Sequence, residues 1–216
     1  MMSLKVIETN IDLNLIKPIL DETPLDNYFT GGYRHRAMSR FKFIGLGKFE
    51  QLPPKPLYQS NKINRLENYG GIERHYAELP RKLVESKEFE IIVNIWVKNL
   101  PISIDLFSVH HIRTFAPGSP VPEGKHRDGY EFVGMYVAQR LNIKQQSGET
   151  TFWNRYTDEV VFNGVLKESD FVIFDDRQLH HYTSEILPAE GERKLRDVWI
   201  FTIPEHGQIT QNYEIA

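Results

Sequence analysis

The second half of the chain alternates short apolar segments with turn residues, which is the pattern of an all-β domain. The apolar segments are rich in β-branched and aromatic residues, and Gly, Pro, Asn and Asp separate them. They lie at about 102–115, 130–140, 149–154, 160–166, 171–175, 179–186 and 196–203. Short strands at this spacing predict a sandwich or a jelly roll.

The first hundred residues predict fewer regular elements. Residues 80–101 carry apolar side chains at three- and four-residue spacing between two prolines, which predicts one helix packed outside a sheet. Residues 33–52 are dense in aromatic and β-branched side chains, and we expect a strand pair there that breaks at a glycine. Weaker patterns predict a short helix at 13–20 and connections with short edge strands at 57–79.

Length and composition favour one domain. A chain of 216 residues, of which 40% are hydrophobic, buries one sizeable core, and β domains of this size commonly stay single. No repeat, low-complexity tract or Gly/Ser-rich linker divides the sequence. We therefore expect residues 1–216 to form a single domain. Residues 1–100 would contribute N-terminal strands and a supporting helix, and residues 101–204 would form the β core.

Charge and composition narrow the classes of function. The formal net charge is −3 and the basic residues are dispersed, which argues against a nucleic-acid partner. The absence of cysteine excludes disulfides, thiolate ligands, iron–sulfur clusters and a cysteine nucleophile, so any metal must be held by histidines and carboxylates. The first twenty residues lack the apolar core of a signal peptide, and no segment is long enough to span a bilayer. We therefore expect a cytoplasmic protein without a membrane partner, whose oligomeric state stays open.

Two histidine-bearing segments carry the most distinctive candidate chemistry. His126 and Asp128 lie two residues apart just before an apolar run, so in a strand they would point to the same face. The pair His180 and His181 follows another apolar run. Two histidines and one carboxylate form the facial triad of non-haem Fe(II) oxygenases, which leaves coordination positions open. The alternative for His126 and Asp128 is an ordinary turn before a glycine, because His-x-Asp alone is weakly specific.

Four sequence blocks extend this pattern along the second half of the chain. They read PEGKHRDGYEFVGMYVAQR, SGETTFW, FVIFDDRQLHHYTSEI and RDVWIFTI, and PEG-x-HRDG is the most specific piece. Together they resemble the bacterial 2-oxoglutarate/Fe(II)-dependent dioxygenases that hydroxylate free amino acids, of the L-isoleucine 4-hydroxylase type. The resemblance covers roughly residues 105–203. It is weaker at 33–43, where this family also has a strand rich in arginine and aromatic residues.

The resemblance implies a fold and a metal site. The implied fold is a double-stranded β-helix, a cupin-like jelly roll that is mainly β with flanking helices. Iron is then held by His126, Asp128 and a distal histidine, and alignment without a gap places His181 rather than His180 at the distal position. The arginine that anchors 2-oxoglutarate on the last strand of this family corresponds to Arg196. Its planar guanidinium suits the two oxygens of a carboxylate.

Other polar residues have candidate roles around this site. Thr183 and Tyr136 are candidates for hydroxyl bonds to 2-oxoglutarate. Arg113 is a candidate for binding a substrate carboxylate, with a structural or surface role as the alternative. His110 and His111 are expected to be packed or hydrogen-bonded strand residues rather than ligands, because the triad is complete without them.

The activity implied by the resemblance consumes Fe(II)-bound 2-oxoglutarate and O2, releases succinate and CO2, and hydroxylates an aliphatic carbon of a free L-amino acid. Ascorbate serves as the reductant in assays. Two alternatives stay open, a non-catalytic metal- or ligand-binding regulatory module and an oxygenase acting on a peptide side chain. The sequence departs from the family at Glu185, where a proline is usual, and at Ser147-Gly148, where paired glycines are usual. We expect both departures to bear on the substrate pocket.

Overall fold

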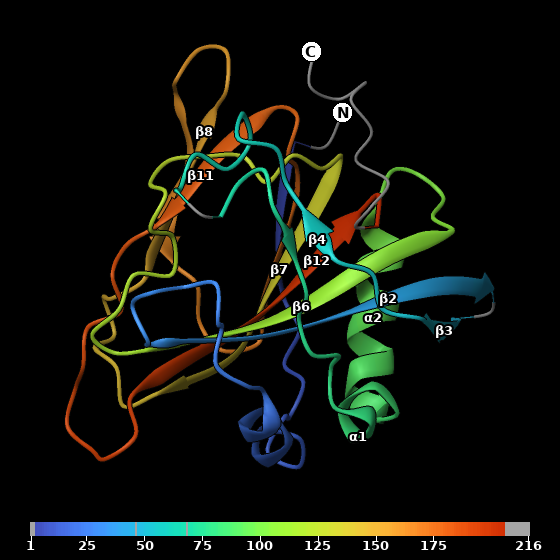
Figure 1. The fold of residues 1–216 in the computed structure, drawn as a ribbon, viewed down its shortest axis with the longest axis horizontal. Helices are drawn as coiled ribbons and strands as arrows, with labels where there is room; N and C mark the ends of the chain where they lie inside the picture. Colours follow the sequence, from blue (N-terminus) through green and yellow to red (C-terminus); the bar gives the residue numbers. More distant parts are fainter. Residues whose placement is uncertain (1–2, 46, 68, 206–216) are drawn as a thin grey trace.

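The computed structural model describes residues 3–45, 47–67 and 69–205, and its strands form three sheets (Figure 1). The largest has the strand order β1-β10-β7-β12-β6-β2-β3, a smaller one has the order β11-β8-β9, and β4 pairs with β5. The strands are β1 (Leu4–Glu8), β2 (Arg34–Gly45), β3 (Lys48–Leu52), β4 (Leu57–Tyr58), β5 (Glu73–Arg74), β6 (Leu106–Phe115), β7 (Phe132–Leu141), β8 (Glu149–Asn154), β9 (Val160–Val165), β10 (Asp170–Asp175), β11 (Leu179–Thr183) and β12 (Leu195–Ile203).

Strands β6 to β12 form the double-stranded β-helix that was expected. Each of the apolar segments predicted after residue 101 contains one strand, with ends that differ by a few residues. β7, β10, β12 and β6 lie in the large sheet, whereas β8, β9 and β11 form the smaller one. All strand pairs in these two sheets are antiparallel. The protein is therefore mainly β with few helices.

Strands β1, β2 and β3 from the first hundred residues extend this core, whereas β4 and β5 form their own two-stranded sheet. β1 pairs with β10 at one edge of the large sheet, and β2 pairs with β6 near the other edge. β2 and β3 are the strand pair expected at residues 33–52. Residues on both sides of position 100 therefore contribute strands to the large sheet.

The helices cover one face of the large sheet, and Figure 1 shows α2 lying along it. The predicted single helix at 80–101 is wrong, because α1 (Arg81–Val84) and α2 (Lys87–Asn99) are separate. Ser86 lies between them, and its hydroxyl caps α2 by accepting the backbone N–H of Phe89 at 3.2 Å. Near the N-terminus a 3-10 helix, η1 (Lys17–Glu22), replaces the helix expected at 13–20. No helix in the described part of the chain is long and apolar enough to cross a membrane.

Alternation along β12 shows how the large sheet separates its two faces. Trp199 and Phe201 belong to the apolar core that also contains Phe89 and Trp96 of α2. Arg196, with the alternate residues Val198 and Ile200, lines a cavity on the other face. The smaller sheet also contributes to that side. The candidate site therefore lies between the two sheets, away from the helices.

Candidate active site

A cavity of about 100 Å3 on the inner side of the large sheet collects most of the predicted site residues. His126, Asp128, His181, Thr183 and Arg196 all line it. The remaining walls combine apolar side chains with polar groups, among them Arg34, Arg36, Asn64, Tyr69, His110, Ile112, Glu123, Met135, Val198 and Ile200. Residues more than seventy positions apart in the sequence therefore meet in one place.

The three expected metal ligands converge within this cavity. One donor atom from each of His126, Asp128 and His181 lies within 4.8 Å of the other two. The carboxylate of Asp128 lies between the imidazoles, with Oδ1 3.4 Å from His126 Nε2 and Oδ2 3.6 Å from His181 Nε2. His126 Nδ1 is 2.9 Å from the carbonyl oxygen of Gly124, so Nδ1 donates to that carbonyl and Nε2 is the ring nitrogen that faces Asp128 and would bind a metal.

The local backbone differs from the strand that His126 and Asp128 were expected to enter. They lie in the loop before β7, and His126 forms a single antiparallel bridge with His181 of β11. Each backbone N–H of this bridge donates to the carbonyl of the other residue, at 3.0 and 2.9 Å. Two of the three candidate ligands are thus positioned by direct backbone hydrogen bonds to each other.

Asp176 holds the rest of this loop in place. Its buried carboxylate accepts the backbone N–H groups of Asp128, Gly129 and Tyr130 at 3.1, 2.8 and 2.9 Å. Burial raises the pKa of Asp176 to about 6, and the neighbouring Asp128 carboxylate adds to the increase. The sequence offered a signal for this role in the Asp175-Asp176 pair, but nothing in the sequence showed which backbone the carboxylate would face.

The charges of the three residues suit a cation. Burial lowers the pKa of His181 to about 3, with a further contribution from His126, so this imidazole is neutral. Burial opposes the charged form of His126 too, but Asp128 raises its pKa to about 9. Burial would raise the pKa of Asp128, yet the two histidines hold it below its ordinary value. A proton on His126 therefore balances the Asp128 carboxylate here, and a metal ion at Nε2 would take its place.

His180 lies outside this group. Adjacent residues of a strand point to opposite faces, and His180 lines a neighbouring cleft with Lys125, Arg127 and Arg155. Burial lowers the pKa of His180, and these three cations lower it further. The geometry places His181, not His180, beside His126 and Asp128.

Arg196 offers the cavity an unpaired cation. The residue is 2% exposed, its Nη2 lies 3.8 Å from the sulfur of Met135, and its Nε has no hydrogen-bond partner among the described residues. Burial lowers its pKa to about 9, and Arg140 contributes. Thr183 lines the same cavity, and its hydroxyl is 3.0 Å from that of Thr150. A buried guanidinium without an anion fits a ligand that brings its own carboxylate.

Two predicted contacts need correction, because their side chains lie on the helix-covered face of the large sheet. Arg113 donates from Nε and Nη2 to the buried Asp197 at 2.8 and 3.0 Å, and from Nη1 to Asp21 at 2.6 Å. It has the structural role that was the alternative to substrate binding. Tyr136 packs against Phe171 and Trp199, with ring centroids 5.5 Å apart in each pair. Neither residue lines the cavity, so Arg113 is not placed to bind substrate there and Tyr136 is not placed to bind 2-oxoglutarate.

The two departures from the family pattern also lie away from the cavity. Glu185 is exposed, and its carbonyl accepts the backbone N–H of Gly148 at 3.2 Å. Ser147 is buried, but its hydroxyl donates to the carbonyl of Lys144 at 2.8 Å. Neither side chain is placed to shape the substrate pocket, contrary to expectation.

Residues 34–36 are the part of the cavity that sequence reasoning missed. Arg34 and Arg36 both line it, and His110 contacts Arg36 there. A signal was present, because residues 33–43 stood out as rich in arginine and aromatic side chains. His110 and His111 are hydrogen-bonded strand residues as expected, and His111 contacts Thr23 and Asp197 on the other face.

Comparison with known proteins adds independent findings. A family model described as 2OG-Fe dioxygenase matches residues 17–202. The structure is similar to a BsmA homologue from Methylobium petroleophilum, with a TM-score of 0.78, 21% identity, and coverage of 97% of this chain and 92% of the other. It is also similar to IDO from Bacillus thuringiensis, with a TM-score of 0.66, 18% identity and 93% coverage of both chains. For the Fe(II)/α-ketoglutarate-dependent dioxygenase TqaL the TM-score is 0.65, at 14% identity and 93% and 82% coverage. No curated protein sequence matches this chain.

Proposed function

Because this chain belongs to the 2OG-Fe dioxygenase family, we propose that it hydroxylates an aliphatic carbon of a free L-amino acid. Membership makes it an Fe(II)- and 2-oxoglutarate-dependent dioxygenase, and the amino acid substrate is the proposed part. One observation carries the assignment of the site. A single cavity contains the His126, Asp128 and His181 cluster together with the unpaired Arg196.

Each residue has a role that its surroundings support. His126, Asp128 and His181 would hold Fe(II) through two imidazole nitrogens and a carboxylate, which is a donor set typical of such oxygenases. Arg196 would bind the distal carboxylate of 2-oxoglutarate, and Thr183 would donate a hydroxyl bond to the same ligand. With both groups bound, the metal supplies O2-dependent hydroxylation coupled to decarboxylation of 2-oxoglutarate to succinate and CO2. The apolar walls, such as Val198 and Ile200, exclude water from that reaction.

The cavity also supports a small zwitterionic substrate. Its volume of about 100 Å3 favours a small molecule over a peptide chain. The cavity walls carry both negative and positive charge. Glu123 supplies a buried carboxylate oxygen without a partner among the described residues, and arginines line the same walls. IDO, an isoleucine dioxygenase, has the same fold, and we extend an amino acid substrate from it to this chain as part of the proposal.

Hydroxylation of each proteinogenic L-amino acid in the presence of Fe(II), ascorbate and 2-oxoglutarate tests this function. We expect at least one amino acid to gain one oxygen atom, detected by mass spectrometry, with succinate in matching amount. Ile, Leu, Val and Met are the first candidates. The His181→Ala variant serves as the control and should form neither product.

Other outcomes separate the parts of the proposal. Succinate that accompanies a hydroxylated peptide, and no hydroxylated amino acid, would show that the substrate class is wrong. Absence of any 2-oxoglutarate consumption by the Fe(II)-loaded protein would contradict the catalytic role of the site and favour a regulatory binding module.

A further inference from the structure

Strand β2 presents three arginines on the same face, and only the middle one lacks a carboxylate. Alternate residues of a strand share a face, which groups Arg34, Arg36 and Arg40. Arg34 Nε donates to Asp26 Oδ2 at 3.0 Å, and Arg40 donates to both oxygens of Glu205 at 2.7 and 2.6 Å. No carboxylate among the described residues forms a salt bridge with Arg36.

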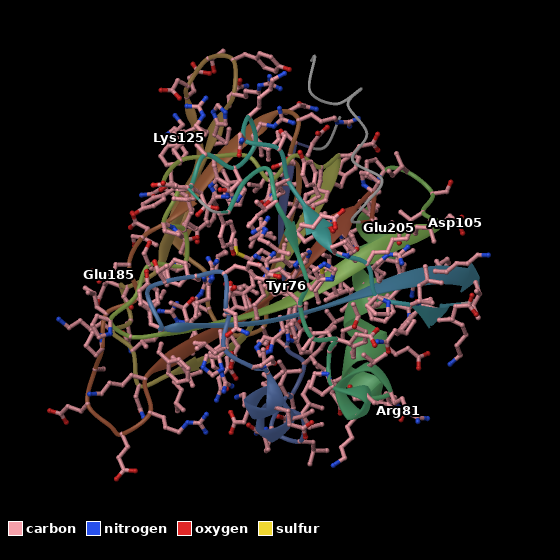
Figure 2. All side chains as sticks on the ribbon, in the orientation of Figure 1. Tyr76, Arg81, Asp105, Lys125, Glu185 and Glu205 are labelled. Atoms are coloured by element: carbon pink, nitrogen blue, oxygen red, sulfur yellow. The ribbon has the colours of Figure 1, made fainter. Side chains whose placement is uncertain are left out.

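The groups in direct contact with Arg36 are neutral, and Asp26 and Asp128 act on it without a salt bridge. Its Nη2 lies 2.8 Å from His110 Nδ1, which must accept because a guanidinium only donates, and its Nη1 donates to the Tyr69 hydroxyl at 3.2 Å. The guanidinium lies over the ring of Tyr76, with Cζ 4.7 Å from the centroid. Tyr76 is labelled in Figure 2. Arg36 Nε is buried and has no hydrogen-bond partner among the described residues. Burial of a cation without an anion is costly, so this arrangement favours binding of an external anion.

A second buried arginine increases the positive charge at this end of the cavity. Arg74 is fully buried and stacks on the ring of Tyr69, with Cζ 3.9 Å from the centroid. It donates to Gln59 Oε1 at 2.6 Å, and its Nε and Nη1 have no partners among the described residues. Arg74 does not line the cavity, so the anion that balances this charge would contact Arg36.

Arg36 is also close to the proposed metal site. It lines the same cavity as His126 and Asp128, and its charge contributes to the low pKa of Asp128. Arg196, the other cavity arginine without a carboxylate, is assigned to 2-oxoglutarate. The cavity therefore has one anchor for the co-substrate and a second, unassigned anchor for another anion.

We propose that Arg36 binds the carboxylate of the substrate and so makes a carboxylic acid the substrate class of this cavity. The proposal rests on the proposed function, because it takes the neighbouring cluster as the reacting centre. Arg36 is a specificity-determining residue, held in position by His110 and Tyr69. Because its planar guanidinium can donate to both oxygens of one carboxylate, it fixes the orientation of the substrate towards the metal.

Calorimetric titration of protein loaded with Zn(II) and 2-oxoglutarate, where no turnover occurs, tests the inference. The probes are the proteinogenic L-amino acids, each paired with its carboxamide, which lacks the carboxylate charge. We expect the wild type to bind at least one acid and to bind its carboxamide at least tenfold more weakly. In Arg36→Gln the affinity for the acid should fall by about ten- to a hundredfold, and the difference between acid and carboxamide should disappear. Arg36→Lys should retain part of the preference, because it keeps the charge and loses the fork.

Arg65→Gln is the matched control. It removes the same charge from an exposed arginine that lines the neighbouring cleft together with Lys125, and it should leave acid binding unchanged. Thermal melting checks that each variant folds. If Arg36→Gln does not fold, the role of Arg36 is tested by comparing acid and carboxamide binding in the wild type and in Arg36→Lys. A preference for the acid that is weaker in Arg36→Lys than in the wild type supports this role, and an equal preference contradicts it.

Three results would overturn the assignment of Arg36. These are equal acid affinity in wild type and Arg36→Gln, a loss of 2-oxoglutarate rather than acid binding in Arg36→Gln, and a wild type that binds none of the acids. Failure of the proposed function is measured separately, as absence of succinate formation by the Fe(II)-loaded wild type. An acid that binds through Arg36 in a protein without that activity would support Arg36 as a carboxylate-binding residue and would contradict only the role of that acid as a substrate.

Discussion

Arg196 is a buried guanidinium whose Nε has no partner among the described residues and whose surroundings include Met135 and the apolar side chains of β12. A charge-assisted hydrogen bond in such a site contributes about 1.5–3 kcal/mol. We therefore expect Arg196→Gln to raise the dissociation constant for 2-oxoglutarate by about ten- to a hundredfold. Titration of 2-oxoglutarate into Zn(II)-loaded protein measures this effect, and metal affinity should stay close to that of the wild type. An unchanged dissociation constant for 2-oxoglutarate would show that another cation, such as Arg36, binds the co-substrate.

The two adjacent histidines give a second prediction at the residue scale. His181 Nε2 lies 3.6 Å from Asp128, whereas His180 lines the neighbouring basic cleft. His181→Ala should therefore abolish tight metal binding, and His180→Ala should leave metal affinity close to that of the wild type, because its side chain lines the neighbouring cleft. Equilibrium dialysis with Fe(II) under anaerobic conditions separates the two variants. The reverse ranking would assign the distal position to His180.

Single residues could be predicted from the sequence only where spacing carried the information. The spacing of His126 and Asp128 predicted that their side chains would point the same way, and the family resemblance added His181 and Arg196, which line the same cavity. Arg113 was misplaced because its partners, Asp21 and Asp197, are remote in sequence. Whether an arginine forms a salt bridge depends on carboxylates that are remote in the sequence. For this reason the sequence also did not show that Arg36 would lack a carboxylate partner.

At the scale of elements, the loop before β7 depends on one carboxylate from the turn after β10. Asp176 accepts three backbone N–H groups from residues 128–130. We expect Asp176→Ala to lower the free energy of unfolding by about 2–4 kcal/mol, because buried donors are left without partners. Metal affinity should also fall, by about tenfold or more, since second-layer partners of a metal site commonly contribute 10–100-fold. Urea unfolding and metal titration measure the two effects.

Asp176→Asn is the conservative variant for the same position. Its amide oxygen still accepts one or two of the three N–H groups, so it should recover part of both losses. A variant that loses stability but keeps full metal affinity would show that Asp176 supports the fold without positioning Asp128.

A buried ion-pair network joins η1, β6 and β12 on the opposite face. Asp197 is fully buried and lies 2.9 Å from His111 Nε2 and 2.8 Å from Arg113 Nε. Burial would raise the pKa of Asp197, but His111 and Arg113 lower it below its ordinary value. A carboxyl whose pKa is lower in the folded than in the unfolded state stabilises the protein above the unfolded pKa of about 4. That contribution is lost as the pH falls further, through the folded pKa.

We therefore expect Asp197→Asn to lower the free energy of unfolding by about 3–5 kcal/mol at neutral pH, because it leaves Arg113 buried without this carboxylate. The loss should shrink as the pH falls below about 4, where the wild type loses the same charge. Urea titrations at several pH values measure both effects. Asp21→Asn, at a partly exposed partner of Arg113, should cost about 1 kcal/mol or less. Equal losses for the two variants would contradict a dominant role for Asp197.

Helices and strands could be predicted from the sequence where the spacing of their apolar residues was regular. The β segments after residue 101 follow from alternation, but the interruption of the helix at Ser86 does not, because a capping serine is compatible with a helix interior in sequence. The loop position of His126 and Asp128 likewise depends on backbone bonds to His181 and on the Asp176 carboxylate. The loop position depends on residues distant in the sequence, whereas the cap at Ser86 is a local contact with Phe89 that the spacing of apolar residues did not reveal.

At the scale of the whole molecule, the candidate site connects parts of the chain that belong to different sheets. His126 and Asp128 precede β7 of the large sheet, whereas His181 belongs to β11 of the smaller one. Sequence periodicity predicted the strands, but which strands share a sheet is decided by pairing between remote segments, as when β1 pairs with β10. A metal bound to all three residues would bridge the two sheets, and it binds only when the chain is folded.

Metal binding should therefore raise the stability of the entire protein. At a free metal concentration one hundred times the dissociation constant, the expected gain is about 2.7 kcal/mol. For a chain of this length, each kcal/mol shifts the melting temperature by about 2–4 °C, so the midpoint should rise by about 5–10 °C. Differential scanning calorimetry with Zn(II), and again after excess chelator, measures a reversible shift. His181→Ala should lose the increase and His180→Ala should keep it, because only His181 lies with His126 and Asp128. A wild type whose midpoint does not respond to metal, or a His181→Ala variant that responds fully, would contradict a metal site that links the two sheets.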